Sequence, residues 1–331
     1  MRNVTCHQVG EKRLAEALDD IRGRAFARWH WLRYGSISPA LIRDMADELL
    51  DHVAARTVTE PGLDAAAGTV AVTAAECVHG VLSVMCYPGG DQELRFPLLG
   101  KRISTDPDDD EFGDGGITFQ DVVKEAPTAR TWLDTFEMCV VSGHVWDWER
   151  VTGLLLRGDY ASAIREGVPY NRYTSVSDPA DLAAMDALCL YLTEAAGHLP
   201  RDWPKVPLRK PDAGELTEAA RRLDEVGGDA LSADQRLLRA LLDDDQHAFE
   251  DALVARLVAY RESVEAEAGD PAPRSLLPLG ALSLACLAVQ VHGWELGVRS
   301  GYLPHGLLGS PHALRRAAEG HRNGLGCWGA E

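Results

Sequence analysis

The chain has 331 residues, enough for two average domains or one large helical domain, and a chain of this length buries most of its unfolded surface without a metal or a disulfide. Its 33 Lys and Arg side chains are outnumbered by 51 Asp and Glu, so the formal net charge is −18. This balance argues against direct nucleic-acid binding and against attachment to an anionic membrane, because both select basic surfaces.

The cysteine pattern indicates a reducing compartment. There are seven cysteines, an odd number, and no two have CxxC spacing. The first residues lack the apolar core and cleavage site of a signal peptide, and the most apolar stretch, 276–289, is too short to span a bilayer. We therefore expect a cytoplasmic protein with reduced thiols, three of them buried in helices: Cys139, Cys189 and Cys286.

Apolar residues recur at three- and four-residue spacing along most of the chain, which predicts an all-α protein. The second predicted helix opens with Ser38 and Pro39, an N-cap and first-turn pair. No alternation of Val, Ile and Thr is long enough to predict a sheet. The predicted helices cover 11–34, 38–53, 69–87, 128–142, 145–156, 160–165, 181–196, 215–226, 233–242, 246–267, 276–292 and 311–319.

Two segments interrupt this pattern. Residues 88–117 are rich in Pro and Gly and form a long irregular excursion, within which a short hairpin is predicted around 94–103. Residues 199–212 form a proline-rich joint. The predicted organisation is an N-terminal helical region, 1–198, and a C-terminal helical region, 213–331, that pack as one unit.

Two places share a local pattern that predicts an αα-hairpin. Residues 155–159 and residues 241–245 each combine a leucine pair, a tight turn and an Asp placed to cap the next helix. Two instances do not define a repeat period. We therefore expect an irregular helical bundle with solenoid-like αα-hairpins.

The sequence contains none of the common catalytic or nucleotide-binding motifs. Glu76 and His79 form a single ExxH pair on the predicted 69–87 helix, whereas di-iron bundles need two such pairs. The pair shares a stripe with Thr73, Ser83 and Cys86, which favours the polar face of an amphipathic helix over a metal site. No cofactor is predicted.

The run from His144 to Glu149 combines an imidazole, two carboxylates and two indoles. Trp146 and Trp148 are candidates for exposed anchors that contact a partner protein, although division between core and rim is the more common arrangement. The same two readings apply to the run 29–31, Trp-His-Trp. If the protein were an enzyme, the first candidates for proton transfer would be His144, Asp147, Glu149, Glu76 and His79.

An acidic segment at 106–114 resembles a calcium loop only superficially, because an EF-hand loop starting at Asp106 would need Gly at its sixth position and Glu at its twelfth. Residues 103–123 contain seven carboxylates and no Lys or Arg. The segment is either solvated surface or a docking surface for a basic partner. In the second case its contact residues are Asp108, Asp109, Asp110, Glu111 and Asp114.

Three stretches resemble the immunity protein 49 family of bacterial polymorphic-toxin systems. They are APTARTWLDTF at 126–136, RALLDDDQHAFEDAL at 239–253 and PRSLLPLGALSLACLA at 273–288, the last followed by Gly-Trp at 293–294 and SGYLP at 300–304. Their order places the resemblance over about residues 10–308. It implies an all-α protein that binds and neutralises a cognate toxin in the cytoplasm, and it carries no catalytic residues. The alternative from the residues is a helical enzyme or self-resistance protein acting on a small molecule.

Overall fold

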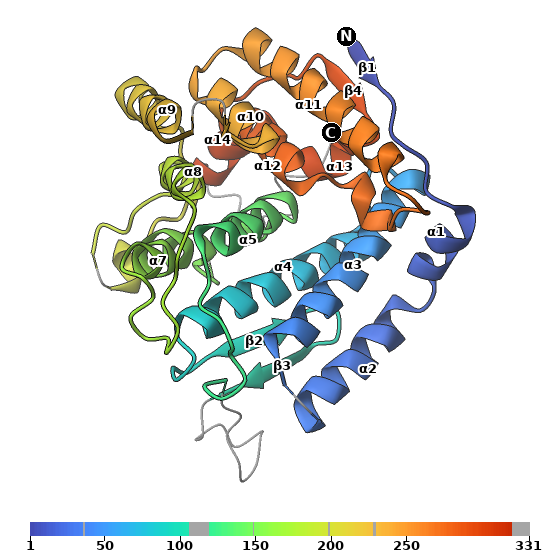
Figure 1. Cartoon of the computed structure of the whole chain (residues 1–331), viewed down its shortest axis with the longest axis vertical. Helices are drawn as coiled ribbons and strands as arrows, with labels where there is room; N and C mark the ends of the chain where they lie inside the picture. Colours follow the sequence, from blue (N-terminus) through green and yellow to red (C-terminus); the bar gives the residue numbers. More distant parts are fainter. Residues whose placement is uncertain (36, 106–118, 148, 198, 228–229, 320–331) are drawn as a thin grey trace.

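The computed structural model is predominantly α-helical, which confirms the predicted fold class (Figure 1). It describes residues 1–35, 37–105, 119–147, 149–197, 199–227 and 230–319. The longer helices are α1 (Glu11–Leu18), α2 (Ile21–Tyr34), α3 (Pro39–Thr59), α4 (Ala65–Cys86), α5 (Ala129–Val141), α8 (Pro179–Cys189), α9 (Ala213–Gly227), α10 (Ala233–Leu242), α11 (Gln246–Ala266) and α12 (Leu279–Gln290). Four shorter helices complete the set: α6 (Thr152–Leu154), α7 (Ala161–Arg165), α13 (His305–Leu308) and α14 (Ala313–Ala318).

The N-terminal helices follow their capping residues. The predicted 11–34 helix is two helices, because Asp20 has a φ of 26° and its carboxylate accepts from the backbone N–H of Gly23 as the cap of α2. Ser38 caps α3 by accepting from the N–H of Leu41, and Pro39 occupies the first turn, as predicted.

Helix α4 is the central element, packed between α3 and α5 (Figure 1). It and the segment Pro273–Gln290 are long and apolar enough by composition to cross a membrane. In each, however, 78% of the apolar window is buried inside the structure, as in the core helix of a globular protein.

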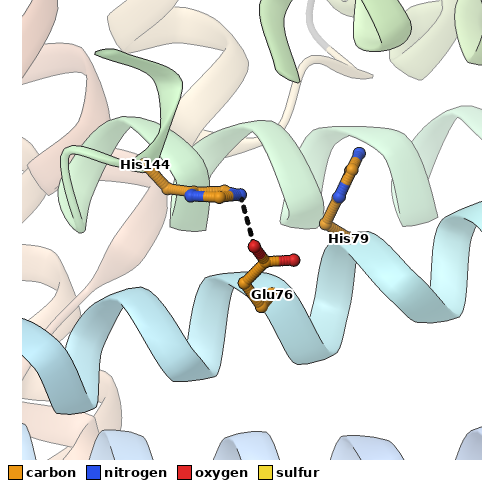
Figure 2. Close-up of side chains that lie close together, drawn as sticks. All are labelled: Glu76, His79 and His144. Carbon is orange, nitrogen blue, oxygen red and sulfur yellow. Dashed lines mark ion pairs between the residues drawn. The ribbon is translucent and has the colours of Figure 1, made fainter. Parts of the chain in front are cut away.

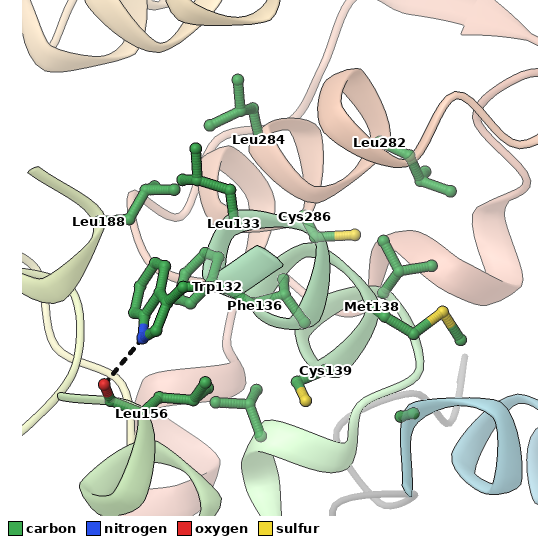
Figure 3. Close-up of a cluster of buried hydrophobic side chains, with 14 of the residues drawn as sticks. Trp132, Leu133, Phe136, Met138, Cys139, Leu156, Leu188, Leu282, Leu284 and Cys286 are labelled. Carbon is green, nitrogen blue, oxygen red and sulfur yellow. Dashed lines mark hydrogen bonds between the residues drawn. The ribbon is translucent and has the colours of Figure 1, made fainter. Parts of the chain in front are cut away.

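The core continues from α5 to α12 (Figure 3). Trp132 and Phe136 of α5 are stacked with ring centroids 5.2 Å apart, and the Trp132 indole N–H donates to the carbonyl of Leu156 at 2.8 Å. Cys139 and Cys286 are buried there, as predicted, and so is Cys189 on α8. One hydrophobic cluster thus includes residues from both predicted regions.

The predicted helices 145–156 and 160–165 are replaced by a less regular path. A 3₁₀ turn (His144–Trp146) is followed by α6, a π-helical turn (Leu155–Tyr160) and α7. Val151 has a φ of 47°, which a β-branched residue rarely adopts and which interrupts the helix. The αα-hairpin predicted at 155–159 is wrong, because Asp159 lies inside a continuous π-helical turn.

The hairpin predicted at 241–245 is confirmed. Helix α10 ends at Leu242, Asp244 has a φ of 53°, and Asp245 caps α11 by accepting from the N–H groups of His247 and Ala248. The chain therefore reverses between two antiparallel helices at the place that the Asp run indicates.

Two short strand pairs accompany the helices. The predicted hairpin is confirmed as β2 (Glu93–Phe96) paired antiparallel with β3 (Lys101–Ser104). The sequence did not predict the parallel pair β1 (Arg2–Val4) and β4 (Val298–Ser300), which joins segments from opposite ends of the chain. Strands of three residues are too short to produce a readable alternation.

The proline-rich segment is fixed to the end of α8. Its residues Pro207 and Arg209 exchange backbone hydrogen bonds with Thr193 and Tyr191, at 2.9 and 2.8 Å. A 3₁₀ turn covers Pro200–Asp202. Beyond it, α9 packs on α8, and a further 3₁₀ turn (Pro273–Leu276) packs on α3.

Candidate functional site

Three of the predicted proton-transfer candidates meet in the interior (Figure 2). Glu76 and His79 project from α4, and His144 reaches them from the 3₁₀ turn after α5. The side chains are 2–3% exposed, and His144 Nε2 lies 3.8 Å from Glu76 Oε1. The prediction that this stripe is the polar face of an amphipathic helix is therefore wrong. Helix α4 is covered by α3 and by α5, so Thr73, Glu76, His79 and Cys86 are all buried.

Arg150 neutralises the buried carboxylate. Its Nε donates to Glu76 Oε1 at 2.9 Å and its Nη2 to Oε2 at 2.8 Å, a bidentate geometry that suits a guanidinium. Asp147 stabilises the turn that leads to Arg150, because its Oδ1 accepts from the backbone N–H of Glu149 at 3.0 Å. We refer to Glu76, His79, His144 and Arg150 as the Glu76 cluster.

Both imidazoles in the cluster are held in the neutral form. Burial, followed by the effect of the neighbouring His144, lowers the pKa of His79 to about 3. Burial likewise lowers the pKa of His144 to about 4, against the opposing effect of Asp147. A neutral imidazole has one N–H donor and one lone pair, so each ring needs two partners of opposite kind.

The donor set of the Glu76 cluster is one that a cation can use, because the ligand atoms of Glu76, His79 and His144 lie within 4.8 Å of one another. One observation counts against a metal centre, because Arg150 already occupies both carboxylate oxygens. Among the described residues, His79 Nε2 and His144 Nδ1 have no hydrogen-bond partner.

The other two proton-transfer candidates stand apart from the cluster. Asp147 is half-buried and engaged with the backbone of its own turn, and Glu149 is exposed. The sequence does not predict the contact of Arg150 with Glu76, because 74 residues separate the two and no local spacing signals such a pair. The five candidates therefore do not form one catalytic constellation.

The predicted partner-contact residues have different outcomes. Trp146, a candidate for an exposed anchor, is instead only 4% exposed and belongs to the core, where its indole N–H donates to the side chain of Gln290. Trp148 lies outside the described residues, as do the five acidic residues Asp108, Asp109, Asp110, Glu111 and Asp114. In the run 29–31, Trp29 is buried and Trp31 is 59% exposed.

A cleft of about 870 Å³ lies between the π-helical turn, α8 and the residues after α8. Two ion pairs line it, Arg157 with Glu194 and Arg165 with Asp186. The strained Val151 also lines it, together with the half-exposed Trp203. None of the Glu76 cluster residues borders this cleft, so the largest opening described here does not lead to the titratable groups.

Comparison with known protein families identifies the chain. The family model of immunity protein 49 matches residues 60–307, well over half of the sequence. The chain belongs to the immunity protein 49 family. No curated protein and no solved structure matches it.

The match confirms the resemblance found in the sequence, with one difference at its start. It begins at residue 60 rather than near residue 10. The segment that defines the immunity protein 49 family therefore includes α4, the Glu76 cluster and the cleft beside the π-helical turn. Helices α1 to α3 precede it.

Proposed function

We propose that the protein is a cytoplasmic immunity protein that binds and neutralises a cognate bacterial toxin without catalysis. The observation that carries this proposal is the match of the immunity protein 49 family over residues 60–307. The arrangement of the titratable groups supports it. The Glu76 cluster is 2–3% exposed at its carboxylate and imidazoles, and its charge is balanced internally by Arg150, as expected of a structural cluster.

The net charge of −18 supports a toxin with a basic surface. Toxins that cut nucleic acid need basic, phosphate-binding clefts, and an acidic inhibitor fits such a cleft by charge. Complementary charge mainly accelerates association and selects the partner, whereas buried contacts hold the complex. The acidic segment 106–114 is the proposed contact for that basic surface.

The alternative function, a helical enzyme that acts on a small molecule, makes a different demand on the structure. It requires a substrate to reach His79 or His144, and neither residue lines any of three surface cavities on the described residues, of about 870, 530 and 420 Å³. No observation on the described residues favours this alternative.

Stoichiometry separates the two functions. The protein is co-expressed with the product of the neighbouring gene, and the cells are scored for rescue of growth. The purified protein is then titrated against that purified product. Neutralisation by binding predicts rescue, co-elution, and complete inhibition at about one equivalent. Protection far below one equivalent without co-elution would contradict the proposal, since only a catalyst turns over. The variant Lys12→Met, which changes a highly exposed side chain on α1, is the matched control and should behave as wild type.

A further inference from the structure

Helix α2 exposes an aromatic face. Its inward residues, Ala25, Trp29 and Leu32, recur at helical spacing and are buried against α3. The opposite side carries Phe26, His30, Trp31 and Tyr34, all exposed. Phe26, Trp31 and Tyr34 are 47, 59 and 68% exposed. We call these four outward residues the α2 face.

The fold does not require this face. Large aromatic side chains that stay in water contribute little to the core, yet Trp and Tyr are the residues most enriched at the energetic centres of protein interfaces. The rings are also partly ordered by each other. The ring centroids of His30 and Tyr34 are 4.8 Å apart, and Phe26 lies 5.6 Å from Trp29. A surface ordered in this way loses less entropy when a partner covers it.

A groove of about 420 Å³ runs beside the α2 face, between α2 and α3. Trp31 and Ala27 line it from α2, and Leu41 and Glu48 line it from α3. The groove gives a protruding apolar side chain of a partner a place next to the exposed indole of Trp31. The exposed rings and the groove thus form one continuous docking surface.

The charge of α2 indicates which kind of partner surface would cover it. The helix carries four arginines and no carboxylate, in a chain whose net charge is −18. One of them, Arg28, pairs with two carboxylates of α3, Asp44 and Glu48. Lys101 adds a further cation, with its Nζ 5.6 Å from the centroid of the Trp29 ring.

We propose that the α2 face docks an apolar, acid-rimmed surface of the cognate toxin. This inference rests on the proposed function and adds the docking surface and its chemistry. Because helix α2 is cationic and the 106–114 segment is anionic, the two contact different parts of the toxin, which fixes the orientation of the complex.

The test measures binding of the purified, catalytically inactivated product of the neighbouring gene. The double variant Trp31→Gln, Tyr34→Gln removes two exposed rings of the α2 face and should raise the Kd about tenfold or more. The matched control is Tyr170→Gln, Val176→Gln, which removes two exposed apolar side chains elsewhere on the surface and should leave the Kd unchanged. Unchanged melting temperatures show that both variants fold.

A second variant tests the charge. Arg22 is exposed at the start of α2, and Arg22→Glu should weaken binding if the covering surface is acidic. Tighter binding by Arg22→Glu, or equal binding by the aromatic variant and wild type, overturns the inference while leaving the proposed function intact. Failure of the wild type to bind overturns the proposed function itself. A wild-type dimer that the aromatic variant converts to a monomer assigns the face to a second copy and also overturns the inference.

Discussion

The indole N–H of Trp146 donates to the side-chain oxygen of Gln290 at 2.7 Å, which joins residues 144 positions apart. Gln290 is 1% exposed at the end of α12, and its amide nitrogen donates in turn to the carbonyl of Leu308 at 3.0 Å. The pair therefore links the turn after α5 to α12 and to the end of α13. It gives Trp146 a structural role in the core.

Replacing Trp146 with Phe should destabilise the protein by about 1–3 kcal/mol, because the buried Gln290 oxygen loses its donor and cannot reach water. The measurement is the free energy of unfolding in urea. The double variant Trp146→Phe, Gln290→Leu should not recover stability fully, since Gln290 also holds Leu308. If the single variant retains wild-type stability but loses toxin binding, Trp146 is a partner contact after all.

The Glu76–Arg150 pair makes a sharper prediction for the core. Arg150→Met should cost about 3–5 kcal/mol, because it leaves a carboxylate that is 3% exposed without its counter-charge. Adding Glu76→Gln removes that buried charge and should restore part of the loss. Lys12→Met breaks the exposed pair with Glu16 and should cost less than about 0.5 kcal/mol. Equal losses in the two single variants would mean that the buried pair contributes no more than a surface pair.

Local signals predicted the regular parts of this fold. The side chains of Ser38 and Asp245 each accept from backbone N–H groups within a few residues, so the sequence indicates where α3 and α11 begin. The path after α5 was not predictable in this way. Val151 adopts a positive φ that its residue type disfavours, so only the surrounding packing explains it.

The candidate site was only half predictable for the same reason. Glu76 and His79 are neighbours on one helix turn, and their spacing alone brings them together. Arg150 reaches them across 74 residues, and β1 meets β4 across nearly the whole chain. Such contacts depend on the tertiary arrangement, which periodicity does not encode. Because the sequence does not reveal the contact with Arg150, the ExxH pair alone does not indicate a buried cluster whose charge is neutralised.

The two cluster histidines make stability depend on pH. Their folded-state pKa values, about 3 for His79 and about 4 for His144, lie below the ordinary value of 6.5. The unfolded chain therefore binds more protons between these values, and the free energy of unfolding should fall as the pH drops below about 6.5. Each histidine contributes a slope of about 1.4 kcal/mol per pH unit in that window.

Urea unfolding at pH 7, 6 and 5 measures this slope. Burial also lowers the pKa of His7, His52 and His292, so the comparison uses the difference between wild type and His79→Gln. That variant should lose about one histidine's share of the slope. Replacing His247, which is exposed on α11, with Gln is the control and should leave the slope as in wild type. If the free energy of unfolding depends on pH in the same way in wild type and His79→Gln, His79 is not a source of the pH dependence.

The acidic segment gives the last prediction, which concerns the rate of toxin binding. Asp108, Asp109, Asp110, Glu111 and Asp114 are followed by Asp121 before the first cation, Lys124, so no neighbouring side chain in the sequence neutralises them. Replacing the five with Asn or Gln should slow association with a basic toxin surface and flatten its dependence on salt, because charge complementarity acts mainly on the association rate. Stability should change little.

Stopped-flow association at several salt concentrations measures the effect. The control is the double variant Glu262→Gln, Glu267→Gln, which removes negative charge on and beside α11. An association rate equal to wild type at every salt concentration would mean that the segment is solvated surface with no part in recognition.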